Sequence, residues 1–316
     1  MPKVSAILPV YGEKYIEQSL RSLLDQTLDD IEFILVDDRS PDSAYDIALE
    51  IIGEEQYAHL RDNIKIIRHD VNKGAHIVRR TGWEASTGDY IYQPDSDDLM
   101  DRDILRKLWE KAVEGDYDMV ECSFWITDAE GNRRRPECPE QYIRNAYEDW
   151  IVWPGTPTYW NKLFKRSVYE NEIIWPKHHY KEDYIIVSQL LTYSRTRAFI
   201  DEPLYSYFLN PAGNAISEDI RRRIEYSKEQ VDILEEFMRG KGLYDRYRTR
   251  FTVMKSDILQ DAWALPWREF LKVLPEERAG ILTCSGVPLK TRLGHISKLL
   301  GIHGISKLFC IIAFFV

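Results

Sequence analysis

Short apolar segments alternate with amphipathic ones over roughly the first 125 residues, and this alternation limits the possible folds more than any other feature. Runs rich in β-branched residues have the length and composition of strands, at residues 4–10, 31–36, 64–67, 90–93 and 118–124. Segments with helical periodicity separate them, at residues 15–24, 44–52, 75–85 and 101–114. Strands that alternate with helices predict an α/β fold with a doubly wound, mostly parallel sheet flanked by helices.

The alternation stops after Thr127. A turn signal at Gly131-Asn132 and a basic run at 133–135 lead into a stretch up to Pro157 that is rich in Trp, Tyr and Pro. Helical periodicity returns at residues 183–193, 219–239 and 244–264. We therefore expect one α/β domain over residues 1–215 and a helical extension over residues 216–316.

The charge distribution argues against a general nucleic-acid-binding protein. The chain has 42 Lys and Arg against 52 Asp and Glu, a net charge of -10, whereas phosphate binding needs clustered cations. Residues 281–316 contain Lys290, Arg292, Lys298, Lys307 and no acid, so this segment carries +4 and the remainder carries -14. The end of the chain therefore presents a different kind of surface.

The four cysteines are far apart in the sequence and form no Cys-x-x-Cys pair: Cys122, Cys138, Cys284 and Cys310. This spacing argues against a zinc site and favours free thiols in a reducing compartment. The sequence begins Met-Pro-Lys and enters the first apolar run without the charged and hydrophobic regions of a signal peptide. We expect a cytoplasmic protein.

The strongest chemical motif is Asp95-Ser96-Asp97-Asp98, directly after the segment 90–93. Ligands of open α/β sheets bind beyond the carboxyl ends of the strands, where this motif lies. Carboxylates one residue apart can hold a hard divalent cation and leave coordination positions for water and a diphosphate. An acidic helix N-terminus ahead of Leu99 is the alternative explanation.

Two further acidic motifs allow both a functional and a structural interpretation. Asp37-Asp38 also follows a strand, where a carboxylate can accept from a uracil N–H or from ribose hydroxyls. Glu182-Asp183 begins a predicted helix, where a carboxylate at a pocket rim can take a proton from an attacking hydroxyl. Helix capping explains either motif when it is taken alone.

Taken in order, these segments resemble the family 2 glycosyltransferases, the large inverting group with the GT-A fold. The resemblance covers roughly residues 4–217, and the remaining residues match no family that we recognise. It rests on these motifs: 4–11 (VSAILPVY), 22–27 (SLLDQT), 32–42 (EFILVDDRSPD), 72–74 (NKG) with Arg79-Arg80, 88–91 (GDYI), 95–98 (DSDD), 160–166 (WNKLFKR), 182–183 (ED) and 204–207 (LYSY). The last three are common in bacterial members that build surface polysaccharides.

The resemblance implies a role for each matching residue. Asp38 would face the base, and the residues expected to bind the donor are Pro9, Tyr11, Asp38, Lys73, Arg80, Asp95 and Ser96. Asp95, Asp97 and Asp98 would hold Mg²⁺ or Mn²⁺ with the donor ribose-diphosphate, and the choice between Asp97 and Asp98 as metal ligand stays open. Asp183 would act as general base, and Glu182 beside it would orient the acceptor.

The function that follows is that of a metal-dependent, inverting glycosyltransferase in cell-surface polysaccharide synthesis. Residues 1–215 would bind the nucleotide-sugar, with a UDP-sugar as the expected donor, and would transfer a hexosyl or N-acetylhexosaminyl group. The acceptor would be a hydroxyl on a growing glycan or lipid-linked saccharide, and the stretch up to Pro157 would lie on the acceptor side unless it is a solvated loop.

Three other functions compete with this one. A catalytically inactive sugar-nucleotide-binding module would have the same donor motifs. A sugar-phosphate nucleotidyltransferase would need a Gly-rich basic loop after the first strand, where the sequence reads Val10-Tyr11-Gly12-Glu13. A phosphatase with an Asp-x-Asp nucleophile would carry that motif on its first strand.

Residues 290–316 combine cations with a terminal apolar run at 308–316 that is too short to span a bilayer. This combination suits attachment to the cytoplasmic face of a membrane, as a peripheral protein near a lipid-linked acceptor. A C-terminal helix buried against its own domain is the alternative. The donor sugar, the linkage and the oligomeric state do not follow from the sequence.

Overall fold

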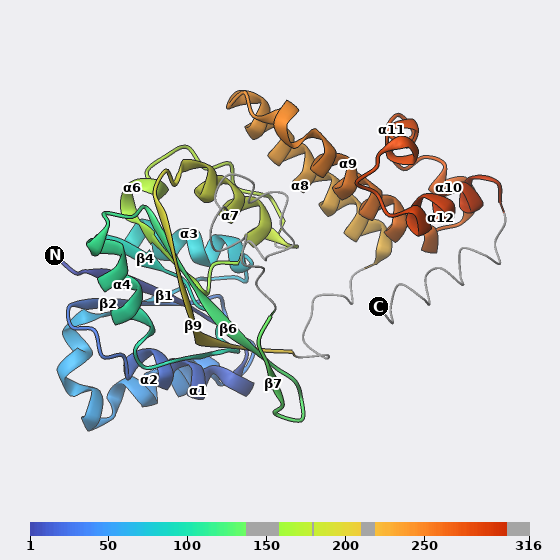
Figure 1. The fold of residues 1–316 in the computed structure, drawn as a ribbon. Helices are drawn as coiled ribbons and strands as arrows, with labels where there is room; N and C mark the ends of the chain where they lie inside the picture. Colours follow the sequence, from blue (N-terminus) through green and yellow to red (C-terminus); the bar gives the residue numbers. More distant parts are fainter. Residues whose placement is uncertain (137–157, 179, 210–218, 302–316) are drawn as a thin grey trace. The chain divides into compact units, whose positions relative to one another are not determined.

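The structure is a computed structural model that describes residues 1–136, 158–178, 180–209 and 219–301 (Figure 1). The chain divides into two compact units. The described part of the first ends at Leu209, and the described part of the second begins at Asp219.

The first unit is built on a nine-stranded mixed sheet. Its parallel half has the order β3-β2-β1-β4 and comprises β1 (Val4–Val10), β2 (Ile31–Asp37), β3 (Ile64–Arg68) and β4 (Tyr90–Tyr92). The other half adds β8 (Lys162–Lys165), β6 (Met119–Thr127), β9 (Arg197–Phe208) and β5 (Leu99–Met100), and β7 (Arg133–Arg134) pairs with β6. The expected doubly wound, mostly parallel sheet is confirmed, with β8 running antiparallel between β4 and β6.

Helices cover both faces of this sheet, because alternate strand residues are apolar on each side. In β1, Ala6 and Leu8 belong to one buried cluster and Ile7 to another. The first cluster is completed by α1 (Glu13–Leu24), α2 (Ala44–Gly53) and α4 (Ile104–Glu114). The second is completed by α3 (Ala75–Ala85), α6 (Arg166–Tyr169) and α7 (Glu182–Tyr193). A 3₁₀ segment, η1 (Glu55–Asn63), leads from α2 into β3.

The parallel strands bring their carboxyl ends to one edge of the sheet, and the loops that follow β1, β2 and β4 begin there. Gly12 and Gly74 have φ values of 84° and 88° and stand directly before α1 and α3. Glycine adopts this left-handed backbone without a steric penalty, so both loops can turn straight into their helices. The acidic motifs therefore start from a common edge.

The second unit is helical, as the sequence predicts. It comprises α8 (Ile220–Gly240), α9 (Tyr244–Asp261), η3 (Ala262–Ala264), α10 (Trp267–Phe270), α11 (Arg278–Thr283) and α12 (Leu289–Leu299). The long helices α8 and α9 pack against each other through buried residues that include Leu234 and Phe251. None of the described helices combines the length and the apolar composition that a bilayer-spanning segment requires.

Two of the four expected free cysteines, Cys122 and Cys284, are free thiols in the structure. Cys138 and Cys310 lie outside the described residues, as does most of the aromatic stretch that ends at Pro157.

Candidate active site

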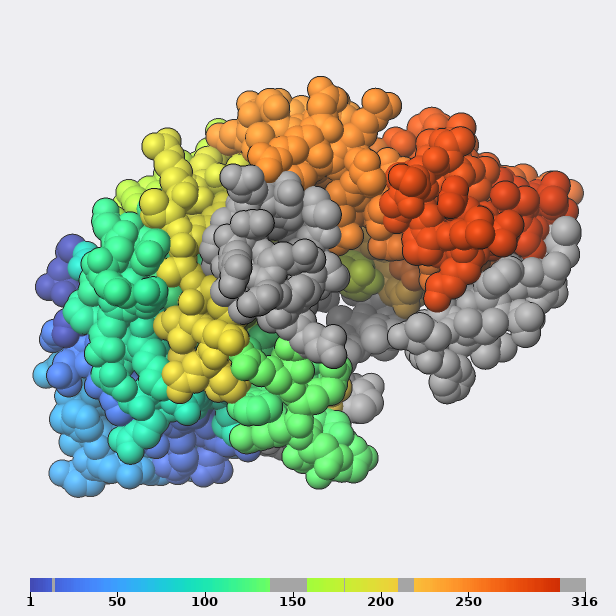
Figure 2. Space-filling view, viewed as in Figure 1, coloured from blue at the N-terminus to red at the C-terminus, as the bar shows by residue number. Residues whose placement is uncertain are grey.

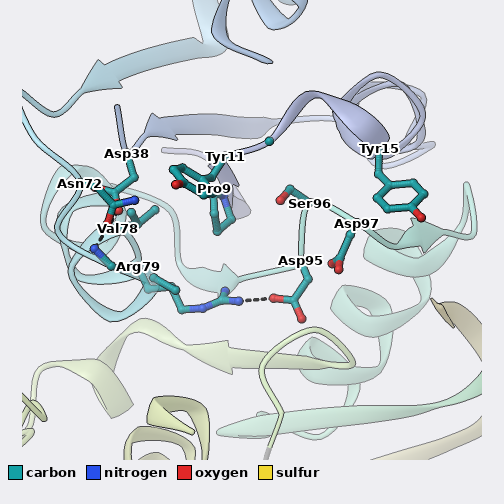
Figure 3. Close-up of a pocket in the computed structure, with 13 residues that line it drawn as sticks. Pro9, Tyr11, Tyr15, Asp38, Asn72, Val78, Arg79, Asp95, Ser96 and Asp97 are labelled. Carbon is teal, nitrogen blue, oxygen red and sulfur yellow. Dashed lines mark hydrogen bonds and ion pairs between the residues drawn. The ribbon is translucent and has the colours of Figure 1, made fainter. Parts of the chain in front are cut away.

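A pocket of about 720 Å³ opens where β1, β2 and β4 end (Figure 3). Its lining comes from the end of β1, from the loops after β1, β2, β3 and β4, and from the first turns of α1 and α3: Pro9, Tyr11, Gly12, Tyr15, Asp38, Asn72, Gly74, Ala75, Val78, Arg79, Asp95, Ser96 and Asp97. Acidic groups stand on two sides of the pocket, Asp38 after β2 and the cluster around Asp97 after β4. The sheet topology thus unites two motifs that are nearly sixty residues apart in the sequence.

Asp95, Asp97 and Asp98 form a tight acidic cluster. One carboxylate oxygen from each lies within 4.8 Å of the others. Asp98 is fully buried, where its two oxygens accept from the Tyr205 hydroxyl at 2.9 Å and from the Phe208 N–H at 2.8 Å. Asp97 is exposed and lines the pocket. Asp98 therefore ties strand β9 to the loop, and Asp97 presents its carboxylate to a ligand.

Desolvation and mutual repulsion disfavour the ionised forms of the carboxyls in this cluster. Although the Asp97 side chain reaches the surface, desolvation of its carboxylate at the pocket wall, followed by the charge of Asp95, raises its pKa to about 6. Burial, followed by the charges of Asp95 and Asp97, raises the pKa of Asp98 well above its usual range. Carboxylates that repel one another in this way are stabilised by a bound cation, and their oxygens are the ligands that Mg²⁺ and Mn²⁺ prefer. The residues present therefore fit a divalent ion.

Arg79 is the cation nearest to this cluster that lines the pocket. Arg79 is only 5% exposed, and its guanidinium pairs with Asp95 (Figure 3) and donates to the Gln93 carbonyl at 3.3 Å. It also lies 4.5 Å from the ring centroid of Tyr159. Burial lowers the pKa of Arg79, but the surrounding charges, with Asp95 first, outweigh this and raise it. Arg79 is thus a fixed positive charge at the wall of the pocket.

The carboxylate of Asp38 is clamped from three sides. Its Oδ1 accepts from the Lys73 N–H at 2.9 Å, and its Oδ2 accepts from the Gly74 N–H at 2.8 Å. The Nδ1 of His69 lies 2.7 Å from Oδ1, and the other ring nitrogen lies 3.0 Å from the Thr81 hydroxyl. Because a carboxylate accepts hydrogen bonds, His69 donates from Nδ1. The clamp fixes an acceptor-only group at the pocket.

Glu182 and Asp183 occupy the first turn of α7, directly after Lys181, whose φ is 51°. Burial raises the pKa of Asp183 to about 6, although the Tyr184 N–H, Arg79 and Lys162 lower it. Burial and the neighbouring Asp183 raise the pKa of Glu182 to about 8. At neutral pH the two carboxyls together therefore retain about one proton.

A buried polar network stands behind this pair. Lys162 is 2% exposed, with its ammonium 2.8 Å from Asn161 Oδ1 and 3.2 Å from Glu121 Oε1. Asn161 also donates to Glu121 at 3.1 Å and to the Cys122 carbonyl at 3.0 Å. Beside it the Trp160 ring stacks on Tyr205 at 4.6 Å. The WNK motif therefore supplies a buried cation whose charge favours the ionised form of Asp183.

A comparison with protein families identifies the chain. The Glycosyl transferase family 2 model matches residues 5–172, more than half of the 316 residues. This protein belongs to glycosyltransferase family 2. The glycosyltransferase is also 33% identical over 263 residues to the uncharacterized glycosyltransferase EpsJ of Bacillus subtilis (strain 168). This alignment covers 78% of this chain and 71% of EpsJ.

Solved structures show the same fold at low sequence identity. S. aureus TarS 1–349, in complex with UDP-GlcNAc, superposes with a TM-score of 0.60 at 17% identity over 97% of this chain and 89% of TarS. The mannosyltransferase PcManGT from Pyrobaculum calidifontis, in complex with GDP-Man and Mn²⁺, superposes with a TM-score of 0.55 at 17% identity over 97% and 86% of the chains. These likenesses support the GT-A fold of the family 2 glycosyltransferase.

The pocket contains most of the residues that the family resemblance assigns to the donor: Pro9, Tyr11, Asp38, Asp95 and Ser96, with Asp97 beside them. Lys73 contributes its backbone N–H to the Asp38 clamp and is absent from the described lining. Asp98 belongs to the acidic cluster but is absent from the described lining. The structure places Asp97, and not Asp98, in the described pocket lining. The sequence alone did not show which of the two faces the pocket.

Arg80 points elsewhere. Its guanidinium donates to Glu84 at 2.8 Å and lies 5.8 Å from the Trp175 ring centroid, and among the described lining residues it is replaced by Arg79. One residue along a helix turns the side chain by about 100°, so Ala75, Val78 and Arg79 share the pocket face of α3 and Arg80 leaves it. Counting in threes and fours from Ala75 would have selected Arg79 from the sequence.

Proposed function

We propose that this glycosyltransferase moves a hexosyl or N-acetylhexosaminyl group from a UDP-sugar to an acceptor hydroxyl, with inversion at the anomeric carbon. The observation that carries the proposal is that two acidic groups share one pocket. The clamped carboxylate of Asp38 lies on one side, and the acidic cluster that fits a metal ion lies on the other. The chemistry resides in residues 1–215, and residues 216–316 lie outside it. The acceptor would be a growing or lipid-linked saccharide in surface polysaccharide synthesis.

Base recognition falls to Asp38. Its Oδ1 already accepts two hydrogen bonds, but its Oδ2 accepts only from the Gly74 N–H and keeps a lone pair. That oxygen can accept from a base that presents an N–H on its pairing edge, as uracil does with N3–H. The backbone amides of Lys73 and Gly74 hold this carboxylate in place, so its orientation does not depend on the ligand. Tyr11, which is 49% exposed at the pocket, offers a ring against which the base can stack.

Asp97 and Asp95 would hold Mg²⁺ or Mn²⁺, which supplies Lewis-acid stabilisation of a departing nucleoside diphosphate. Asp98 is fully buried, is absent from the described pocket lining and accepts from β9 through both oxygens, so it would position the loop rather than ligate. Arg79 stands at the same wall and would contact the donor diphosphate through the part of its guanidinium that Asp95 leaves available.

Asp183 would take the proton of the acceptor hydroxyl as that oxygen attacks the anomeric carbon. The bond between this carbon and the phosphate oxygen breaks, the bond to the acceptor oxygen forms, and the proton passes to Asp183. Attack from the face opposite the leaving group inverts the configuration. Glu182, protonated at neutral pH, would donate a hydrogen bond to an acceptor hydroxyl and orient it.

The test is release of nucleoside diphosphate from UDP-, GDP- and dTDP-sugars with Mn²⁺ or Mg²⁺ and then with EDTA, together with calorimetry of donor binding. Metal-dependent release from a UDP-sugar, lost in Asp97→Ala and kept in the exposed control Asp46→Ala on α2, is the expected result. Binding without release, even with saccharide acceptors present, would support the inactive module. If calorimetry detects no binding of any nucleotide-sugar, the proposed function is wrong.

A further inference from the structure

Helix α12 in the second unit carries its apolar side chains outward. Leu289, Leu293, Ile296 and Leu300 are 63%, 46%, 40% and 70% exposed. Their spacing of four, three and four residues places them on one stripe of the helix. The opposite face is buried and contains polar residues instead: Thr291, His295, Ser297 and Lys298. This is the reverse of the arrangement expected for a surface helix of a globular domain.

Specific contacts prevent the helix from turning this stripe inward. The Nε1–H of Trp263 donates to His295 Nδ1 at 2.9 Å. The Lys298 ammonium donates to the carbonyls of Trp263 at 2.8 Å and Leu265 at 2.9 Å. At Gly294, an added Cβ would lie 2.3 Å from the Trp263 ring, so the helix packs closely there. Rotation would bury the stripe but would break the Trp263–His295 hydrogen bond and the charge-assisted hydrogen bonds of Lys298.

The residues around the stripe suit a membrane surface. Trp267 is 38% exposed at the end of the helix, where its ring N–H donates to the Leu299 carbonyl at 3.3 Å. Tryptophan favours the boundary between lipid and water. Lys290 is exposed beside Leu289, Arg292 is half-buried, and no acid occurs between residues 281 and 316. The C-terminal part that contains α12 is drawn in red in Figure 2.

We infer that the α12 stripe (Leu289, Leu293, Ile296 and Leu300, with Trp267) is a docking surface for a bilayer that contains anionic lipids. Apolar side chains flanked only by cations within their own segment complement an anionic interface, which an apolar protein partner would not require. The sequence after Gly301 keeps this character, with Lys307 and no acid. The stripe would hold the enzyme against the lipid surface by its second unit.

The test is co-sedimentation of the full chain with phosphatidylcholine vesicles that contain about 30% phosphatidylglycerol, beside pure phosphatidylcholine vesicles. We expect the double variant Leu293→Glu, Ile296→Glu to reduce binding to the anionic vesicles at least about tenfold. The matched control is Leu49→Glu, Val113→Glu, which changes two side chains of similar exposure, 40% and 49%, on α2 and α4. The control should bind like the wild type. Circular dichroism establishes that each variant is folded.

Two results would overturn the inference. One is unchanged vesicle binding of the folded Leu293→Glu, Ile296→Glu variant. If binding is then lost in a second variant, Phe314→Glu, Phe315→Glu, the apolar end of the chain binds the membrane without the stripe. The other is light scattering that shows a wild-type dimer which the α12 variant dissociates, without vesicle binding by either protein. In that case the stripe is covered by a second copy of the chain.

Discussion

Replacing Asp183 with asparagine tests the proposed base with little change in shape. The pKa of this carboxyl is about 6, so about 90% of it is ionised at pH 7 and about 10% at pH 5. Wild-type kcat/KM for transfer should therefore fall about tenfold per pH unit below pH 6. Asp183→Asn removes the acceptor of the proton and should lower kcat at pH 7 by about 10²- to 10⁴-fold.

The assay is nucleoside diphosphate release from the preferred donor with a saccharide acceptor between pH 5 and pH 9. Glu182→Gln is the control, because it keeps Asp183 and should retain the acidic limb near pH 6. A rate for Asp183→Asn within tenfold of the wild-type rate at pH 7 would refute the role of Asp183 as base.

The same pKa shift predicts that folding stability falls with rising pH, whereas activity rises. Burial raises the pKa of Asp183 above the unfolded value near 3.8, so its contribution is fully present below that value and is lost as pH rises through about 6. Asp183→Asn should therefore unfold at a higher urea concentration than the wild type at pH 8 and not at pH 4. An equal shift at both pH values would contradict this reasoning.

Three further predictions concern single side chains. Asp98→Ala removes the acceptor of the Tyr205 hydroxyl proton and of the Phe208 N–H, so urea unfolding should show a loss of about 2–4 kcal/mol. Asp97→Ala should lose metal-stimulated release without destabilising the fold, and equal destabilisation by both variants would contradict these separate roles. Arg79→Lys cannot contact Asp95 and the Gln93 carbonyl together, so KM for the donor should rise about tenfold in steady-state assays, while Arg80→Lys should leave it unchanged. Gly294→Ala places a methyl group against Trp263 and should cost about 1–3 kcal/mol in thermal unfolding, unlike Gly280→Ala, whose added Cβ meets nothing within 4 Å.

The local pattern of the sequence was sufficient for the parallel half of the sheet. Strands β1 to β4 and their helices carry strong periodicity, and the acidic motifs follow from where those strands end. Strands β8 and β9 were not predicted as strands, because their partners are distant: Leu163 pairs with Tyr92 and Val120. Such pairing depends on tertiary packing rather than on local propensity.

The site shows the same division between motif and orientation. The sequence locates Asp97 and Asp98 in one motif, yet only the path of β9 shows that Asp98 serves Tyr205 and Phe208. His69 gave no signal, because a single histidine after a strand resembles any other polar loop residue until Asp38 is placed 2.7 Å from it. The sequence predicted the residue types of the site better than the directions of their side chains.

The antiparallel strand between β4 and β6 also governs how the chain reaches its native state. β4 ends at Tyr92 and pairs on one side with β1, but its other neighbour begins only at Lys162. Ribosomes add about 5–20 residues per second, so β4 would wait roughly 4–14 s during synthesis for the 70 residues between Tyr92 and Lys162. During that time the nascent chain presents an open edge next to the acidic loop. Because an unpaired sheet edge can pair with another chain, a chaperone that shields this edge during synthesis should increase the soluble yield of the enzyme.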